Sequence, residues 1–248
     1  MSKLILAELW GLVKDRKFYV ILATSLWVYI FVGAAIANPD MLTMSGTNVN
    51  IVSYLGLMTQ ISDTLFLVVG LTIYYAASVV NKQIENGQIW YYKCYTPGKL
   101  YFAKTINIII IFGTYCLLNL VNLSIAYYVF FTQQYPTVFV RGAGEVTSWD
   151  IAFIGFMLIQ QTVQLLVGYI VSIKFGATYC ILSALGYYLL GKVSSKIRLI
   201  KWLFPINYLS MDIEMSFAFY ITIVAGFIVF IFILICLGYL MFQKKMKK

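Results

Sequence analysis

Long apolar stretches restrict the fold of this chain more than any other feature of its sequence. The 248 residues are 62% hydrophobic and only 11% charged, whereas ordinary soluble domains carry roughly 25% charged residues. A helix needs about 20 apolar residues to cross the hydrocarbon core of a bilayer. The sequence therefore predicts an all-α membrane protein of one domain, with six transmembrane helices near residues 18–37, 61–80, 106–131, 151–173, 175–191 and 217–242.

A polar segment at residues 81–104 separates the second apolar stretch from the third. It contains one carboxylate, Glu85, and four lysines, Lys82, Lys93, Lys99 and Lys104. Short loops rich in lysine and arginine stay on the cytosolic side of a membrane. We therefore expect this segment to face the cytosol and to form a docking surface for a soluble partner.

The first 17 residues have the pattern of an amphipathic helix that lies on the membrane surface. Apolar side chains recur at helical spacing on one side, while Lys3 and Lys14 lie on another. A helical extension of the first span is the alternative. A cleaved signal peptide is disfavoured, because this lead carries Glu8 and Asp15 and the apolar run after it has the length of a full span.

Six spans place both termini in the cytosol, where the lysines of the C-terminal tail are expected. The fifth stretch, 175–191, is short, since about 17 helical residues rise roughly 25 Å. If it dipped into the membrane and returned, the tail would lie outside, and the balance of basic residues between the two sides would be the same. We favour six spans, because modest bilayer thinning accommodates a short helix.

Polar residues within the predicted spans require partners, because an unpaired amide in lipid is costly. Such side chains either line a substrate path or form hydrogen bonds between helices, and both interpretations stay open. For Asp63, near the expected outer end of the second span, a solvated helix cap is favoured over an ion site. The path candidates are Asp63, Asn119, Asn122, Gln160, Gln161 and Gln164.

Composition disfavours several other functions. The chain has no histidine, and its acids are not closely paired, so an intramembrane enzyme is disfavoured. The net charge of +9 resides in loops and termini, which indicates topology and not nucleic-acid binding. Residues 186–192 match the G-x4-G-K skeleton of a phosphate-binding loop, but Val193 replaces the required Ser or Thr inside an apolar stretch. We expect no cofactor site in this chain.

The polar segment also carries a spaced motif. Glu85-Asn86-Gly87 follows the second stretch, and Pro97, Lys99 and Lys104 follow about ten residues later. In this order the chain resembles the membrane subunit of an ABC transporter of the type-2 exporter class. The sequence departs from the family pattern at two places, where Gln88 replaces the usual Thr or Ser and Gly98-Lys99 replaces a small-Arg pair.

The resemblance implies a coupling helix after the second span that is seated on a separate ATPase, which would bind ATP and Mg²⁺. Two permeases, identical copies or paralogues, would face each other. The expected ATPase contacts are Glu85, Asn86, Gly87, Gln88, Trp90, Tyr91, Pro97 and Lys99. Residues 192–216 would form an outer interfacial segment that narrows the exit, with gate candidates Lys196, Arg198, Trp202 and Pro205.

Small permeases of this kind are associated with export of, or immunity to, antimicrobial or toxic peptides of the lantibiotic, bacitracin or phenol-soluble modulin type. The resemblance thus implies a multi-pass protein of the bacterial cytoplasmic membrane whose partners are lipid, an ATPase and an amphipathic peptide. Two alternatives stay open. One is a stand-alone immunity protein or small channel without an ATPase, and the other is an exporter of lipids or small drugs.

Overall fold

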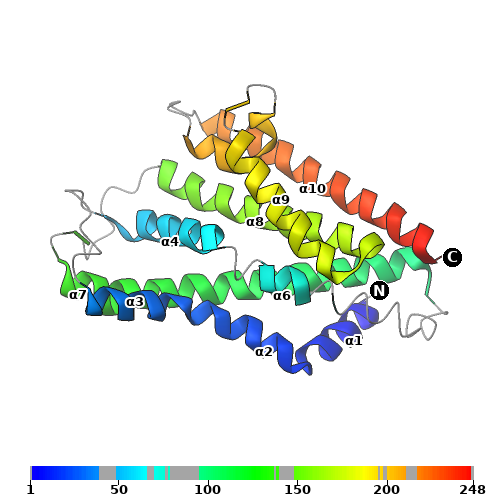
Figure 1. Cartoon of the computed structure of the whole chain (residues 1–248), viewed down its shortest axis with the longest axis horizontal. Helices are drawn as coiled ribbons and strands as arrows, with labels where there is room; N and C mark the ends of the chain where they lie inside the picture. Colours follow the sequence, from blue (N-terminus) through cyan, green and yellow to red (C-terminus); the bar gives the residue numbers. More distant parts are fainter. Residues whose placement is uncertain are drawn as a thin grey trace.

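A computed structural model shows a bundle of long helices (Figure 1). In the described part of the chain, the regular structure is helical apart from one isolated bridge between Val49 and Phe139. The structure describes residues 2–38, 49–65, 70–75, 78, 95–136, 138–139, 148–194, 196–197, 200–210 and 217–246.

The chain begins with two separate helices. Helix α1 spans Ser2–Val13, and α2 starts at Arg16 after a break at Lys14 and Asp15. The first helix is therefore separate from the first span and is not a straight extension of it. That it lies on the membrane surface stays a prediction. The first span consists of α2 (Arg16–Ala23), η1 (Thr24–Leu26) and α3 (Trp27–Ala37).

Helix α4, Ile51–Leu65, begins ten residues before the predicted start of the second span. Its N-terminus is capped by Asn50, whose side-chain oxygen accepts a 2.8 Å hydrogen bond from the backbone N–H of Ser53. Asparagine is among the preferred N-cap residues because it satisfies such a free amide. Asp63 thus lies 12 residues into the helix and is only 1% exposed, so the interpretation as a solvated cap was wrong. Residues 70–75 are also helical.

Helix α6, Pro97–Ala126, continues through the π-helical turn η4 (Tyr127–Phe131) into α7 (Thr132–Gln134). Pro97 occupies the first turn of α6, where its fixed φ favours a helix start. The third span was predicted to begin at residue 106, so the helix starts earlier and includes the end of the expected cytosolic segment. At about 1.5 Å per residue, the 30 residues of α6 extend roughly 45 Å.

Helices α8 (Ser148–Phe175) and α9 (Ala177–Ser194) form an antiparallel hairpin. Gly176 joins them with φ of 97°, a left-handed conformation that glycine adopts without strain. The 3-10 helices η5 (Lys201–Leu203) and η6 (Pro205–Ser210) follow, and the final helix is α10, Phe217–Met246.

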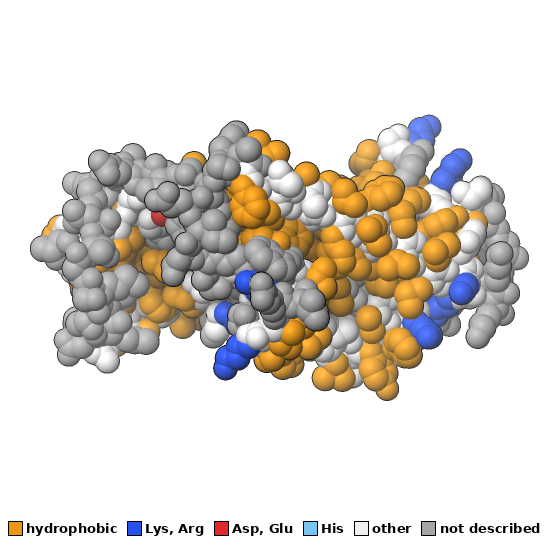
Figure 2. Space-filling model, turned by 90° about the horizontal axis from the view of Figure 1, so that it is seen from above, with side chains coloured by type: hydrophobic (Ala, Val, Ile, Leu, Met, Phe, Trp, Pro, Cys, Tyr) orange, Lys and Arg blue, Asp and Glu red, His pale blue; other side chains and the backbone are white. Residues whose placement is uncertain are grey.

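Four described helical segments are long and apolar enough to cross a membrane: Phe18–Ala37, Pro97–Gln134, Asp150–Phe175 and Phe219–Met246. The chain is therefore a membrane protein. Both termini lie at the same end of the bundle (Figure 1). Figure 2 shows a broad apolar surface, with basic side chains gathered at that end and in a second group nearer the middle.

The core falls into two main clusters along the bundle. The cluster near the termini packs Tyr101, Tyr169 and Phe242 from α6, α8 and α10 together. The other cluster, toward the opposite end, packs Val28, Tyr54 and further aromatic residues around the end of α6. Helix α6 contributes to both clusters, as does the first span through Ile21 and Val28, so these two elements link the two halves of the molecule.

Candidate functional site

The expected ATPase contacts are only partly within the described residues. Glu85, Asn86, Gly87, Gln88, Trp90 and Tyr91 lie outside them. Pro97 and Lys99 lie in the first turn of α6, and Lys99 is exposed. The start of α6 lies at the end of the bundle that carries both termini (Figure 1).

One turn further along α6, a buried ion pair joins this helix to α1. The Nζ atom of Lys104 lies 3.1 Å from Oε2 of Glu8, and the two side chains are 2% and 4% exposed. The side-chain amide of Asn107 also donates a 3.1 Å hydrogen bond to the carbonyl oxygen of Ile5. The buried residues of α1 are Leu4, Glu8 and Leu12. The one charged side chain among them, Glu8, points toward Lys104.

This ion pair ties the position of α1 to that of α6, because separating the two charges is costly. Removing one member of a buried ion pair leaves an uncompensated charge and costs about 3–5 kcal/mol. Three neighbouring polar atoms, Oε1 of Glu8, Oδ1 of Asn107 and the Tyr169 hydroxyl, have no hydrogen-bond partner among the described residues. The junction of α1 and α6 is therefore both fixed and polar, at the end of the bundle nearest the proposed coupling segment.

Asn119 and Asn122 of α6 form hydrogen bonds with the first span. Trp27 donates through Nε1 to Oδ1 of Asn119 at 2.9 Å. Asn122 donates to Oγ of Ser25 at 3.0 Å and accepts from the Tyr29 hydroxyl at 3.4 Å. Of the two interpretations left open for these residues, the structure supports hydrogen bonding between helices.

The glutamines of α8 differ from these asparagines. Gln160 and Gln164 are fully buried, and both amide atoms of each side chain lack a hydrogen-bond partner among the described residues. Gln161 is buried as well, at 3% exposed. An unsatisfied buried polar group costs about 1–3 kcal/mol. These two side chains are therefore expensive to keep in the middle of a membrane helix, which favours a functional role.

The packing of α4 on α8 brings Asp63 of α4 to the level of the buried glutamines of α8. The Ser53 hydroxyl donates to Oδ1 of Asp150 at 2.6 Å, and the ring of Phe153 packs directly over Gly56. The helices thus run parallel, as Figure 1 also shows. The same offset along the two helices places Asp63 at the level of Gln160. Oδ1 of Asp63 is buried and has no hydrogen-bond partner among the described residues.

Helix α9 contributes a fourth polar group. Cys180 and Ala184 pack against Gly168 of α8, so the antiparallel register places Tyr187 near Gln164. The Tyr187 hydroxyl is close enough to Asp63 to interact with it electrostatically, and it too lacks a hydrogen-bond partner in the described structure. We call Asp63, Gln160, Gln164 and Tyr187 the Asp63 cluster.

The outer segment packs back against the bundle. Pro205 begins η6 and is buried, Lys196 is exposed in the turn after α9, and Trp202 lies in η5. Arg198 lies outside the described residues, as does the side chain of Trp202. The stacking of Tyr208 on Phe156, with ring centroids 5.7 Å apart, joins η6 to α8.

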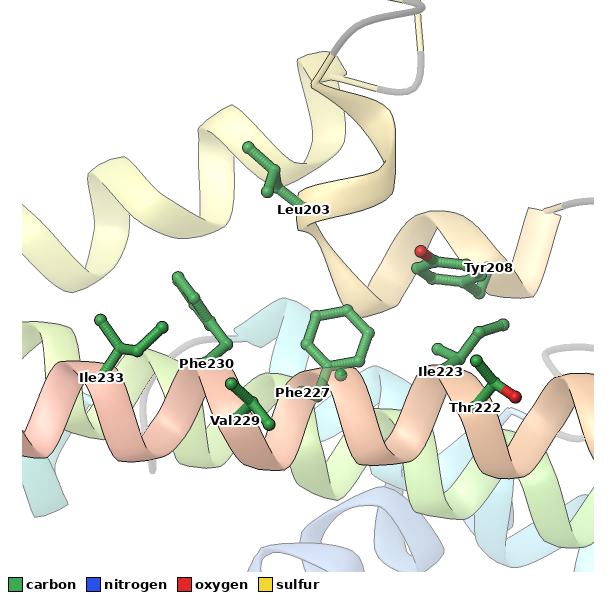
Figure 3. A pocket seen from close by; sticks show the side chains of 9 residues that line it. Leu203, Tyr208, Thr222, Ile223, Phe227, Val229, Phe230 and Ile233 are labelled. Atoms are coloured by element: carbon green, nitrogen blue, oxygen red, sulfur yellow. The ribbon is translucent and has the colours of Figure 1, made fainter.

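An open apolar pocket of about 480 Å³ separates this outer segment from α10. Phe227 and Phe230 of α10 point toward Leu203 of η5 across it (Figure 3). Its lining is mostly aliphatic and aromatic, with the hydroxyls of Tyr208 and Thr222 at one end. Such a groove suits a lipid acyl chain or another apolar side chain.

Comparison of the chain with protein-family models, with characterised proteins and with solved structures finds no match. The site therefore rests on its own geometry. Sequence reasoning did not predict two of its parts, the Glu8–Lys104 pair and Tyr187. A signal for the first existed, because Glu8 lies one turn from both Leu4 and Leu12 on the face that packs against the bundle.

Proposed function

We propose that this chain is the permease subunit of an ABC exporter of the type-2 class that moves an amphipathic antimicrobial or toxic peptide out of the bacterial cytoplasmic membrane. A separate soluble ATPase would bind ATP and Mg²⁺ and supply the energy. Six spans with both termini in the cytosol fit this proposal. In that arrangement α9 crosses the membrane, and its antiparallel packing along α8 supports this.

The observation that carries the proposal is the buried Glu8–Lys104 pair. It joins the amphipathic helix α1 to α6 immediately after the segment that would contact the ATPase. A push on residues 85–99 would therefore move α1 and the start of α6 together. Rigid elements joined in this way transmit a small displacement, because packed interfaces have discrete arrangements and do not deform continuously.

Transport requires two packings of the bundle with different affinities for the peptide. Closure of the ATPase pair on ATP would favour one packing, and hydrolysis would release it. A peptide that binds both packings equally well would not shift the equilibrium. Because α6 belongs to both core clusters, its displacement would reach the outer half of the bundle. Helix α8 shares the first cluster with α6 and contacts η6 through Phe156 and Tyr208, so it would carry the movement on to the gate candidates in η5 and η6.

A stand-alone immunity protein or channel needs no such mechanical link between a cytosolic segment and the bundle. One observation favours an exporter of lipids over a stand-alone protein. The apolar pocket between α10 and η5–η6 could hold an acyl chain. Lipid-stimulated and peptide-stimulated ATP hydrolysis by the purified complex distinguish these two substrates.

Co-purification from the native membrane tests the proposed function. The tagged chain is expected to retain a soluble ATP-binding protein, and Glu85→Lys is expected to lose it while the variant stays folded. Asp150→Asn is the matched control, because it removes a carboxylate at the opposite end of the bundle. Equal recovery of the ATPase with the wild type and with Glu85→Lys would contradict the proposed docking surface.

A further inference from the structure

We infer that the Asp63 cluster is a binding site for a primary ammonium group, located near the middle of the membrane. Four side chains from α4, α8 and α9 contribute to it, and each has at least one buried polar atom without a hydrogen-bond partner among the described residues. Gln160 and Gln164 lie close to the centre of the candidate span Asp150–Phe175. The site is therefore remote from both membrane surfaces.

The chemistry of the cluster favours a singly charged cation. Asp63 is its only carboxylate, so a divalent ion would keep an uncompensated charge in a poorly solvated place. The carboxylate oxygen of Asp63 and the amide oxygens of Gln160 and Gln164 are three unpaired acceptors. A primary ammonium has three N–H donors. These three oxygens can accept the three N–H donors of an ammonium, and the amide N–H groups of the two glutamines and the Tyr187 hydroxyl complete the polar surroundings.

One charged side chain opposes such a ligand. Lys192 of α9 is close enough to Asp63 to interact with it electrostatically. Its positive charge repels a second cation near Asp63. The two charges should therefore have opposite effects on cation affinity. Removing the Lys192 charge should strengthen binding of a cation, and removing the Asp63 charge should abolish it.

The source of the ammonium group depends on the proposed function. If the chain exports a peptide, the ammonium belongs to a lysine side chain or the N-terminus of that peptide, and the Asp63 cluster selects cationic substrates. If no ATPase associates with the chain, the proposed transport function is wrong. The cation site is tested separately, since equilibrium binding to the isolated chain does not require ATP.

Binding is tested with the full chain in phosphatidylcholine nanodiscs by thermal unfolding. The total cation concentration is kept constant with tetramethylammonium, which has no N–H donors, and is exchanged stepwise for n-butylammonium or sodium. We expect butylammonium to raise the unfolding temperature and sodium to have no such effect. Equal stabilisation by sodium, or no stabilisation by butylammonium, would overturn the ammonium site.

Single-residue variants test whether the stabilisation by butylammonium arises at the Asp63 cluster. Asp63→Asn, which preserves shape, is expected to weaken butylammonium binding about tenfold or more, since hydrogen bonds to charged groups are the stronger class. Lys192→Met is expected to tighten it by roughly twofold or more. Asp15→Asn, in the break between α1 and α2, is the control and should leave the affinity unchanged. If Asp63→Asn does not fold, Gln164→Met takes its place, and an unchanged affinity in that variant contradicts the site.

An amphipathic peptide with a single lysine then identifies the source. The peptide is expected to compete with butylammonium, whereas its acetyl-lysine twin, which lacks the charge, is expected not to compete. Equal competition by both peptides, or by neither, would overturn the link between this site and a peptide substrate.

Discussion

Lys104 and Glu8 are the two side chains whose individual replacement has the largest expected consequence. Both are buried, and their side chains form an ion pair with each other. A buried ion pair adds little stability by comparison with an apolar pair of similar volume, but its rupture is costly. The stability of the α1–α6 junction therefore depends on whether one charge or both are removed.

We predict that Lys104→Met and Glu8→Leu each lower the unfolding free energy by about 3–5 kcal/mol. The double variant Glu8→Leu/Lys104→Met should recover most of this loss, because no buried charge is left alone. Thermal unfolding in detergent measures the effect, and Lys99→Met, an exposed lysine at the start of the same helix, is the control. Additive losses in the double variant would contradict the pairing.

Trp27 gives a smaller and separate prediction. Its Nε1 donor bonds to Asn119 at 2.9 Å, so Trp27→Phe removes one hydrogen bond between the first span and α6. Hydrogen bonds between membrane helices contribute about 0.6 kcal/mol on average. We expect a loss of roughly that size plus a packing term, and Trp27→Phe combined with Asn119→Leu should be less than additive. Full additivity would show that the two side chains do not interact.

The pairs Asn119/Asn122 and Gln160/Gln164 show how much the sequence predicts about individual polar residues. Helical spacing predicts that the members of each pair share a face, but it does not identify the partner. Asn119 meets Trp27, whereas Gln160 and Gln164 have no partner among the described residues. This difference depends on the offset between helices far apart in the sequence, and hydrophobic periodicity does not encode that offset.

The helices pack most closely where glycine lies between them. A Cβ atom on Gly168 of α8 would stand 2.5 Å from Cγ2 of Ile73 and 3.0 Å from the carbonyl oxygen of Cys180. The second neighbour is backbone and does not move aside easily. Gly168 thus permits the close contact of α8 with α9 and residue 73, and this contact sets the register that brings the Asp63 cluster together.

We predict that Gly168→Ala destabilises the protein by about 1–3 kcal/mol, the usual cost of overpacking. Gly113→Ala on α6 is the matched control, because nothing lies within 4 Å of its Cβ position. It should be neutral or stabilise by up to about 1 kcal/mol through helix propensity. The two variants are compared by thermal unfolding, and a Gly168→Ala protein as stable as Gly113→Ala would contradict the packing described above.

Helix boundaries were predictable for some elements and not for others. The fourth and sixth predicted spans coincide closely with α8 and α10, because their apolar runs are continuous. Helix α4 starts earlier than predicted, since its first turns mix serine, threonine and glycine with apolar residues and its cap, Asn50, resembles a loop residue. Composition alone assigned those turns to an outside segment.

For the whole molecule, the balance of basic residues leaves open whether the fifth apolar stretch crosses the membrane. We predict six crossings. After removal of the native cysteines, Lys245→Cys should react with an impermeant maleimide only in permeabilised cells, and Lys196→Cys should react in intact cells. The reverse pattern would show that the tail lies outside and that α9 does not cross the bilayer.

ATP hydrolysis by the complex tests the central proposal most directly. The chain is purified with its associated ATPase, reconstituted in lipid, and assayed with and without a cationic amphipathic peptide, with Glu85→Lys as the uncoupled variant. We expect ATP hydrolysis that rises when the peptide is added and that is lost with Glu85→Lys. A chain that purifies without any ATPase activity, or a complex whose hydrolysis responds to neither the peptide nor Glu85→Lys, would contradict the assignment as an exporter permease.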